Sequence, residues 1–415
     1  MLGSMTRRVA RSRVTRGALV IGAAAVLAVA GCSSKSTDND SGGDSGSGGL
    51  KITPLVQVDK DGKEVPAADT SAAADPAGDG KTKCAPETSI AMAGPLTGPN
   101  ANLGLNIVRG VKLALDKHNK ANADCQVKLK EFDTEGNPQK AGQVIDRILG
   151  DQSIVALIGP TFSGETKATG QRISDTGLLS LTPSATNTDL TKNGWKTFFR
   201  GLGNDGIQGP SVAKYLQSTG KYKKICVVQD NTDYGTGLAK SLTETLGPLA
   251  DPSCAVNVKE GDKDFSAAVS KLSSAKPDGI FYAGYYAEAA PLVQQLRSGG
   301  VTATFISDDG TKDVEFVKQA GNASKDSVVS CPCGPAPDKF AEEYKALNGF
   351  EAGTYSTEGY DLTTIVLKGL AQGKVSRADL VEYVRTYEGQ GVARQYKWDP
   401  TGELSNALIW MYQVK

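Results

Sequence analysis

The chain has 415 residues, of which 39% are hydrophobic, and it balances 46 basic against 46 acidic residues. This length supports one large domain or two lobes with ample cores. Five arginines lie before residue 17, so the chain without its first 31 residues keeps 41 basic and 46 acidic residues. No basic patch remains that would indicate a nucleic-acid partner.

The first 31 residues have the pattern of a secretory signal. Arginines are followed by an apolar run at 18–30, which is shorter than the roughly 20 residues that a spanning helix needs. The run ends in Val29-Ala30-Gly31-Cys32, which resembles the lipobox of bacterial lipoproteins. The resemblance implies cleavage after residue 31 and a lipid anchor on Cys32 at the outer face of the cell membrane. The alternative is a plain secretory signal followed by an incidental cysteine.

The segment after Cys32 is predicted to be a tether. Residues 33–49 are almost entirely Ser, Gly, Asp, Asn, Lys and Thr, a composition typical of a flexible linker. Residues 50–83 include some Val, Ile and Leu, but Ala, Asp, Gly and Pro dominate. We therefore expect residues 32–83 to form a flexible, poorly ordered tether.

Six cysteines follow Cys32, and an even number in an exported chain is typical of disulfides. Six cysteines allow 15 pairings. The places of four cysteines in or beside predicted strands favour the pairs Cys84–Cys125 and Cys226–Cys254. Cys331 and Cys333 are close enough only for each other, which gives the third pair, Cys331–Cys333.

From residue 86 onward, short apolar runs alternate with amphipathic stretches. The first series of predicted strands is 89–93, 127–132, 154–158, 178–181 and 197–200. The second series is 224–228, 255–258, 279–283, 304–307 and 327–330. Predicted helices between them include 104–119, 138–149, 206–218, 235–246 and 265–274, and the C-terminal quarter adds helices at 337–347, 356–372 and 377–386 and strands at 395–398 and 408–414.

This alternation predicts an α/β fold of mostly parallel sheets with helices on both faces. Two five-stranded sheets are favoured over one sheet of ten strands. The join is expected near 201–209, where glycines indicate a flexible crossing. The segment 201–206 matches G-x-G-x-x-G, but it lacks the context of a dinucleotide site. The expected lobes are 84–204 with 334–395, and 205–333 with 396–415.

Candidate ligand-binding residues follow the predicted strands, because ligands of open α/β sheets bind beyond the strands' carboxyl ends. Ser163 and Thr186 are each predicted to begin a helix after neighbouring strands of the first series. A hydroxyl beside free backbone N–H groups suits an anion, so the two residues together suit one carboxylate. Taken singly, each residue is more readily interpreted as an ordinary helix cap, and it is their shared location that favours a carboxylate site.

The second series places aromatic and acidic residues after its strands: 230–235, 284–288 and 307–310. A carboxylate there would suit an ammonium group, and tyrosines would suit an apolar side chain. The alternatives are lobe-edge packing for the tyrosines and a solvated turn for Asp308 and Asp309.

Several blocks in order resemble the Leu/Ile/Val-binding proteins of branched-chain amino acid ABC transporters, type I periplasmic binding proteins. The resemblance runs from about Ser89 to the C-terminus. The blocks are Gly94-Pro-Leu-Thr-Gly-Pro99, Leu181-Thr-Pro-Ser-Ala-Thr186, Asp233-Tyr-Gly-Thr-Gly-Leu238, Lys263-Asp-Phe-Ser266, Tyr282-Ala-Gly-Tyr285 and Lys397-Trp-Asp-Pro-Thr-Gly402. It implies two α/β lobes, joined by three hinge crossings, that close on a ligand.

The resemblance also implies roles for individual residues. Ser163 and Thr186 would bind the ligand carboxylate, and the Ser184 carbonyl and Asp309 would hold its ammonium. Asp309 stands where family members often carry glutamate, and Leu103 stands where an aromatic often lines the pocket. The implied ligand-binding set is Leu103, Phe162, Ser163, Ser184, Ala185, Thr186, Tyr234, Tyr285 and Asp309. The family's first-lobe disulfide is missing, since Gly136 and Phe162 lie near its positions.

The predicted function is capture of an aliphatic amino acid and delivery to an ABC permease, by a monomer that needs no cofactor or metal. One alternative is a sensor component for an amide, urea or amino acid. An enzyme is not expected, because the only histidine, His118, falls in a helix where we expect it to be solvated. The lack of a Cys-x-x-Cys pair also argues against a metal site.

Overall fold

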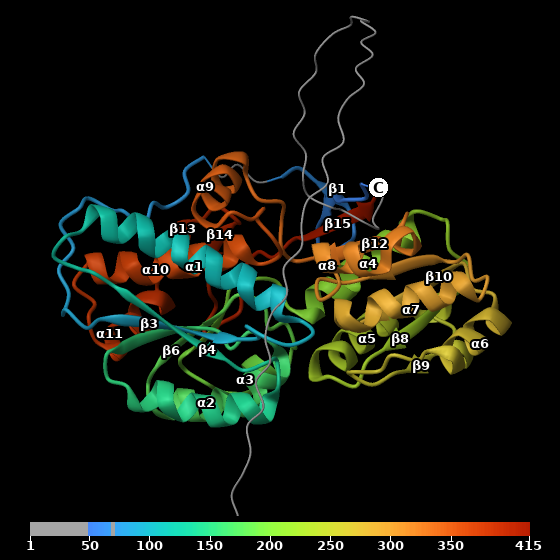
Figure 1. The fold of residues 1–415 in the computed structure, drawn as a ribbon, viewed down its shortest axis with the longest axis horizontal. Helices are drawn as coiled ribbons and strands as arrows, with labels where there is room; N and C mark the ends of the chain where they lie inside the picture. Colours follow the sequence, from blue (N-terminus) through green and yellow to red (C-terminus); the bar gives the residue numbers. More distant parts are fainter. Residues whose placement is uncertain (1–48, 68–70) are drawn as a thin grey trace, which may run out of the picture. The chain divides into compact units, whose positions relative to one another are not determined.

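The computed structural model describes residues 49–67 and 71–415. The predicted signal sequence, Cys32 and the start of the predicted tether lie outside the described residues. The first sheet has five parallel strands in the order β4-β3-β5-β6-β7. Of these, β3, β4 and β6 are labelled in Figure 1. These strands are β3 (Ser89–Gly94), β4 (Lys128–Asp133), β5 (Ile154–Ile158), β6 (Leu179–Thr182) and β7 (Phe198–Arg200). The prediction of a five-stranded parallel sheet from the first series is confirmed.

The helices of the first sheet follow from its strand order. Because crossovers between parallel strands are right-handed, α1 (Ala101–Ala121) covers one face, and α2 (Pro138–Gly150) and α3 (Ser163–Asp175) cover the other. Helix α10 (Ser356–Ala371) packs against α1. A Cβ on Gly110 of α1 would lie 2.1 Å from the Ser356 carbonyl oxygen, so only glycine allows this close approach.

The second sheet is larger than predicted, with eight strands in the order β2-β1-β15-β12-β11-β10-β8-β9. Its parallel part comprises β8 (Ile225–Gln229), β9 (Val256–Asn257), β10 (Gly279–Ala283), β11 (Thr304–Ser307) and β12 (Val328–Cys331). The C-terminal β15 (Ile409–Val414) adds to β12 in the antiparallel sense. Around this sheet lie α4 (Asp205–Ser218), α5 (Asp233–Leu246), α6 (Ser266–Ala275), α7 (Tyr286–Ser298) and α8 (Val314–Ala320).

The two remaining strands of this sheet lie in the segment that is predicted to be a flexible tether. β1 (Ile52–Val58) pairs with β15, and β2 (Glu64–Val65) pairs with β1. The expectation of a flexible segment is therefore wrong for these residues. The sequence pattern hides the strand because Pro54 lacks an N–H donor and the register shifts between Pro54 and Val56, which breaks the apolar alternation.

The end of the predicted tether contacts Gln390 and residues at the C-terminal end of α1. The Ala74 N–H donates to the Gln390 carbonyl at 2.8 Å, and the Asn122 side chain donates to the Ala77 carbonyl at 2.9 Å. His118 Nδ1 lies 3.1 Å from the Pro76 carbonyl oxygen. His118 is fully buried, so the expectation of a solvated histidine is wrong, because the segment before Cys84 covers it.

The C-terminal region shifts one expected lobe boundary. It contains α9 (Asp338–Asn348), α11 (Arg377–Arg385), β13 (Glu388–Gln390) and β14 (Gln395–Lys397), which pairs with β13. The Tyr396 hydroxyl donates to Asp361 of α10, and the Trp398 ring lies 5.7 Å from Phe199 of β7. Residues 396–404 thus contact the first-sheet elements, and the crossing expected at 395/396 lies at 405–408 instead.

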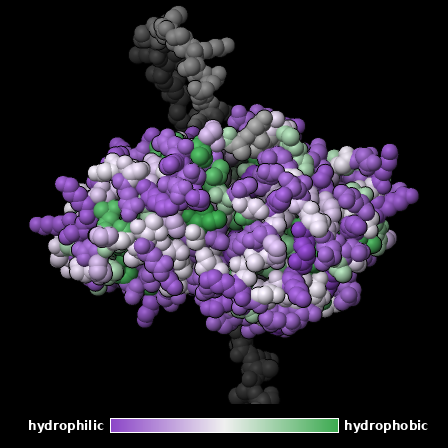
Figure 2. Space-filling view, turned by 180° about the vertical axis from the view of Figure 1, so that it is seen from behind, coloured by the Kyte–Doolittle hydropathy of each residue, from purple (hydrophilic) through white to green (hydrophobic). Residues whose placement is uncertain are grey.

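All three predicted disulfides are present: Cys84–Cys125, Cys226–Cys254 and Cys331–Cys333. Cys226 lies in β8, and the Cys331–Cys333 pair closes a two-residue step at the end of β12. The core lies between sheets and helices, whereas the face shown in Figure 2 is mostly hydrophilic with small apolar areas. No helix among the described residues has the length and apolar character to cross a membrane.

If β1 is an integral part of the second sheet, its buried side chain should matter for stability. Val58 is fully buried, whereas Leu55 of the same strand is 40% exposed. Val58→Ala should lower the free energy of unfolding by about 2 kcal/mol, because two apolar groups are lost and a cavity remains. Leu55→Ala should stay within about 0.5 kcal/mol of wild type. Urea unfolding measures both, and an unchanged midpoint for Val58→Ala would contradict an integral β1.

Candidate ligand-binding site

The predicted ligand-binding residues lie in loops or first helical turns after parallel strands, and all of them are buried. They are Leu103, Phe162, Ser163, Ser184, Ala185, Thr186, Tyr234, Tyr285 and Asp309. Their placement agrees with the rule that ligands bind beyond the carboxyl ends of strands. Whether each of them contacts a ligand stays a prediction.

Ser163 and Thr186 meet in one loop system after β5 and β6. Ser163 begins α3, as predicted, and its Oγ accepts from the backbone N–H groups of Thr186 at 3.2 Å and Asn187 at 3.1 Å. Thr186 does not begin a helix: it lies in a loop, and the next helical turn is at Leu190–Asn193. Its N–H is already used by Ser163, so Thr186 offers its hydroxyl. The Ser184 hydroxyl donates to the Thr161 carbonyl.

Asp309, which follows β11, is held by two tyrosines. The Tyr234 hydroxyl donates to one carboxylate oxygen at 2.7 Å, and the Tyr355 hydroxyl donates to the other at 2.5 Å. The Gly310 N–H donates to the Tyr234 hydroxyl oxygen at 3.2 Å, which fixes that ring. Each carboxylate oxygen keeps accepting capacity, because an ionised carboxylate offers about four lone-pair sites.

Aromatic rings connect the two groups of residues. Phe162 and Tyr285 have ring centroids 4.3 Å apart, and Tyr285 and Tyr234 have centroids 5.2 Å apart. Phe162 precedes Ser163 at the first sheet, whereas Tyr234 bonds Asp309 at the second. The rings therefore form a continuous apolar wall between the hydroxyls and the carboxylate.

Helices that follow strands of the first sheet also contact helices that follow strands of the second sheet. Lys167 of α3 pairs with Asp233 of α5 at 2.6 Å, and the Asn187 side chain donates to the Asp233 carbonyl at 2.6 Å. The Asn102 side chain of α1 donates to Asp313, beside α8, at 2.7 Å. These polar contacts place the site residues in a closed, buried arrangement.

Sequence reasoning missed three residues that belong to this region. Asp205 and Gln208, in the first turn of α4, are fully buried, and Tyr355 bonds Asp309. Asp205 lies in the glycine-rich segment that was predicted only as a crossing. Tyr355 follows α9 rather than a strand and has φ +67°, so the strand-end rule could not find it. Its positive φ leaves no signal in a single sequence.

Several buried polar atoms near these residues have no hydrogen-bond partner within the described part of the chain. They are Thr186 Oγ1, both Asp205 carboxylate oxygens, Gln208 Oε1, Asp230 Oδ2, Tyr282 OH and Asp308 Oδ1. Buried polar groups are nearly always paired in folded proteins. A polar ligand or an ordered water molecule would supply the hydrogen-bond partners that these atoms lack among the described residues.

Burial dominates the electrostatics of this cluster. It raises the pKa of Asp205 to about 8, an effect that the neighbouring Thr186 hydroxyl opposes and the Asp309 charge reinforces. Burial likewise raises the pKa of Asp309, against the tyrosine hydrogen bonds, and it raises that of Asp308 together with the adjacent Asp309. Neighbouring buried carboxyls of this kind favour protonation unless a cation joins them.

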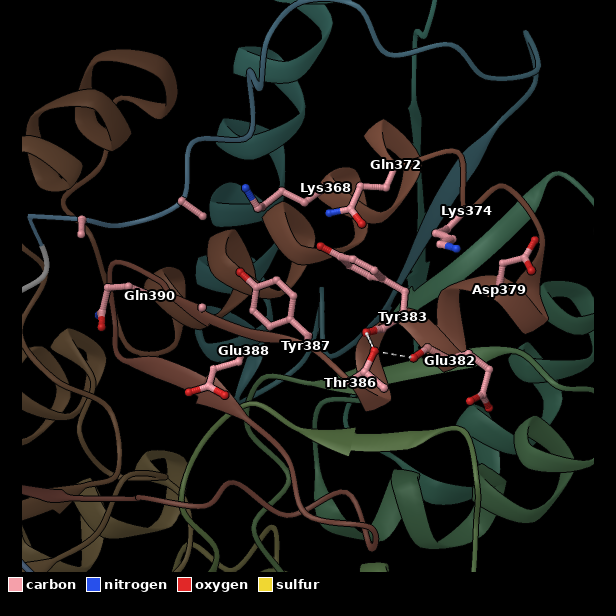
Figure 3. Close-up of a pocket in the computed structure, with 13 residues that line it drawn as sticks. Lys368, Gln372, Lys374, Asp379, Glu382, Tyr383, Thr386, Tyr387, Glu388 and Gln390 are labelled. Atoms are coloured by element: carbon pink, nitrogen blue, oxygen red, sulfur yellow. Dashed lines mark hydrogen bonds between the residues drawn. The ribbon is translucent and has the colours of Figure 1, made fainter.

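Other features of the described residues do not compete with this site. No group of three or more His, Cys, Asp or Glu side chains there is arranged to hold a metal ion. A surface hollow of about 750 Å³ is lined by the end of α10, α11 and β13 (Figure 3). It carries Tyr383 and Tyr387 with charged side chains of both signs, and none of the predicted ligand-binding residues lines it.

The raised pKa of Asp205 predicts a pH dependence of stability. The folded protein keeps this carboxyl protonated up to about pH 8, whereas an unfolded aspartate releases its proton near pH 4. Between these values the folded state binds more protons, so the free energy of unfolding falls as pH rises, by about 1.4 kcal/mol per pH unit for one such group.

Asp205→Asn should therefore flatten the slope of unfolding free energy between pH 5 and 7, by up to about 1.4 kcal/mol per unit. Urea unfolding of the ligand-free protein at pH 5, 6 and 7 measures the slope. The exposed Asp175→Asn serves as a control that should leave the slope unchanged. Equal slopes for wild type and Asp205→Asn would exclude a protonated Asp205.

Comparison with known proteins places this geometry in a family. The family model described as "Periplasmic binding protein" matches residues 87–415. The leucine-, isoleucine-, valine-, threonine-, and alanine-binding protein of Pseudomonas aeruginosa is 30% identical over 335 residues, covering 78% of this chain and 89% of that protein. The Leu/Ile/Val-binding protein of Escherichia coli is 28% identical over 327 residues, covering 77% of this chain and 89% of that protein.

The fold agrees with solved structures. The branched-chain amino acid transporter substrate binding protein of Streptococcus pneumoniae, solved in complex with isoleucine, superposes with a TM-score of 0.72 at 26% identity, covering 78% of this chain and 95% of that one. A leucine binding protein of Thermotoga maritima superposes with a TM-score of 0.71 at 25% identity, covering 78% and 94%. Two mostly parallel sheets flanked by helices, matched over these lengths, show that the chain belongs to the periplasmic binding protein family, with the type I fold.

Proposed function

We propose that this protein is an extracytoplasmic substrate-binding protein that captures an aliphatic amino acid, with branched-chain amino acids as the first candidates. It delivers this ligand to the permease of an ABC transporter. The observation that carries the proposal is the pairing of hydroxyls beyond one sheet with a tyrosine-held carboxylate beyond the other. A zwitterionic amino acid has a negative carboxylate to accept from the hydroxyls and a positive ammonium group to pair with the aspartate carboxylate.

The ligand carboxylate is assigned to Ser163 and Thr186. Ser163 Oγ accepts from two backbone amides, which leaves its own proton free to donate, and the Thr186 hydroxyl has no hydrogen-bond partner among residues 49–67 and 71–415. Hydrogen bonds from hydroxyls to a charged acceptor contribute more than those between neutral groups.

The ligand ammonium is assigned to Asp309. A cation between Asp309 and its acidic neighbours Asp205 and Asp308 offsets the repulsion that otherwise favours their protonated forms. The aliphatic side chain is assigned to the wall formed by Phe162, Tyr285 and Tyr234. The names of the P. aeruginosa and E. coli relatives and the isoleucine in the S. pneumoniae structure support this ligand class.

Binding is proposed to favour the closed arrangement. The contacts of Lys167 with Asp233 and of Asn102 with Asp313 join elements of the two sheets, so they form only when the two sheets approach. A ligand that touches both sheets shifts the equilibrium toward this state by its differential affinity. A permease that contacts both halves of the protein at once would recognise the ligand-bound form. A lipid on Cys32 would keep the protein at the membrane.

Leucine, isoleucine or valine should stabilise the protein, by about 2.7 kcal/mol at 100 times the dissociation constant. Ser163→Ala and Thr186→Ala should each weaken binding roughly tenfold or more, because each removes a hydrogen bond to a charged group. The exposed Ser218→Ala, a hydroxyl loss of the same size in α4, should bind like wild type. Calorimetric titration measures the affinities. Binding that is equally tight in all three variants would rule out the carboxylate assignment.

Ammonium capture by Asp309 predicts proton release. Burial raises the pKa of Asp309 in the free site, and a bound ammonium favours the charged carboxylate, so its pKa falls on binding. In the pH range between these two values, binding releases a proton and affinity rises with pH. Titrations with leucine in two buffers of different ionisation enthalpy detect the released proton.

Two comparisons isolate the ammonium. 4-Methylpentanoate, which is leucine without its amino group, should release no proton from the wild-type protein. Asp309→Asn should bind leucine at least tenfold more weakly and release no proton from this site. Unaltered proton release in Asp309→Asn would assign the titration to another group and remove the support for Asp309.

A further inference from the structure

The segment Lys397-Trp-Asp-Pro-Thr-Gly402 is one of the sequence blocks that resemble the family, and the proposed ligand contacts leave it without a role. In the structure it forms a rigid turn that ends at Glu403. The Asp399 carboxylate accepts from the Thr401 N–H at 2.8 Å, the Thr401 hydroxyl at 2.6 Å and the Glu403 N–H at 3.2 Å. The Asp399 N–H donates to the Glu403 carbonyl at 2.9 Å, which closes the turn.

This turn is pressed against β7. The Arg200 N–H donates to the Gly402 carbonyl at 2.9 Å, and the Trp398 indole N–H donates to the Arg200 carbonyl at 2.6 Å. Gly402 has φ +88°, and a Cβ there would lie 2.2 Å from the Phe198 carbonyl oxygen. Only glycine satisfies both conditions, so the turn has one position on the strand.

The turn presents Glu403 to Arg200. The Arg200 side chain is fully buried. The guanidinium makes a two-pronged ion pair with Glu403, at 3.0 Å from Nε and 2.9 Å from a terminal nitrogen. Thr191 donates a further hydrogen bond to Glu403 at 2.8 Å. Burial alone would raise the pKa of Glu403, but Arg200 and Thr191 outweigh it and hold that pKa below its usual value.

The remaining donors of Arg200 reach the loop that contains Thr186. They donate to the carbonyl of Ala185 and, at 3.0 Å, to the carbonyl of Asn187. The Thr186 carbonyl accepts from the Asp205 N–H at 2.9 Å. Three consecutive carbonyls of the loop are thus bonded to donors, while the amides of Thr186 and Asn187 donate to Ser163. The Thr186 hydroxyl of this loop has no hydrogen-bond partner in the part of the chain that the structure describes.

We propose that Arg200 and Glu403 are a positioning pair: they hold the loop 185–187 in the conformation that presents Ser163 and Thr186 to the ligand carboxylate. The inference rests on the proposed function for its ligand. The pair touches no ligand itself; it acts through the loop. A lysine at position 200 could not replace the arginine, because one ammonium lacks the planar fork that reaches a carboxylate and two carbonyls together.

The same sheet provides a matched control. Arg377 of α11 donates to the carbonyls of Leu149, Asp151 and Ile154 at 3.3, 2.8 and 3.0 Å. It therefore clamps a loop in the same way, but at the opposite, N-terminal end of β5. A purely structural role for Arg200 predicts that Arg200→Lys, like Arg377→Lys, changes binding only as far as it changes stability.

The experiment compares Arg200→Lys, Glu403→Gln and Arg377→Lys with wild type. Titration with leucine, isoleucine and valine measures affinity, thermal unfolding measures stability, and hydrogen exchange of the ligand-free protein measures the loop that contains the amides of Thr186 and Asn187. We expect at least a tenfold rise in dissociation constant and at least tenfold faster exchange of this loop in Arg200→Lys and Glu403→Gln. Arg377→Lys should lower stability and leave both other readouts within twofold of wild type.

The readouts separate the two ways in which the inference could fail. Glu403→Gln keeps the shape of a side chain that is 16% exposed, so it tests the pair even if Arg200→Lys does not fold. If wild type binds none of the three amino acids, the proposed function fails, and loop exchange still tests the positioning role. Unchanged loop exchange in Glu403→Gln, or an equal loss of affinity in Arg377→Lys, would overturn the proposal.

Discussion

Parallel strands place their carboxyl ends along one edge of a sheet, so the loops that leave that edge are brought together whatever their distance in sequence. In this protein both sheets obey the constraint, and both sets of loops carry polar groups that are buried. Ser163 and Thr186 leave neighbouring strands of the first sheet, and Tyr234 and Asp309 leave strands of the second. The fold would lose this convergence if the strands that precede these loops were antiparallel.

Burying acidic groups side by side is costly, and the structure limits the cost in two ways. Tyrosine hydroxyls donate to Asp309, and burial shifts Asp205 toward its protonated form. Neither solution satisfies all the lone pairs, since both oxygens of Asp205 and one of Asp308 have no hydrogen-bond partner among the described residues. Unpaired acceptors of this kind favour the binding of a cationic group, because the carboxylate oxygens have already lost their water and need not be desolvated again.

The sequence predicts most of the parallel strands and the first sheet, because short apolar runs bounded by turns are strong signals. It also predicts the three disulfides, two from the places of the cysteines beside strands and the third from the nearness of Cys331 and Cys333 in sequence. β1 escaped prediction because Pro54 and a register shift interrupt its pattern. His118 was expected in solvent because nothing in the sequence says which distant segment will cover a helix face.

The same limit applies within the site. Residues that directly follow strands could be predicted, since their location depends on strand direction alone. Tyr355 and Asp205 reach the site through the packing of α10 and α4, which a single sequence does not encode locally. Arg200 stands in a predicted strand, but its partner Glu403 is 203 positions away in sequence. Pairings at such distances come from the tertiary structure.

The stretch between Gly49 and Cys84 bonds to both halves of the molecule. It contributes β1 to the second sheet, and it is joined to the first through Ala74, Ala77 and the Cys84–Cys125 disulfide. The chain thus passes between the sheets a fourth time, in addition to the passages at 201–204, 332–337 and 405–408. Each passage is a covalent connection between the two halves. Four covalent connections, rather than three, therefore join the two halves, and any movement of one half relative to the other has to keep all four intact.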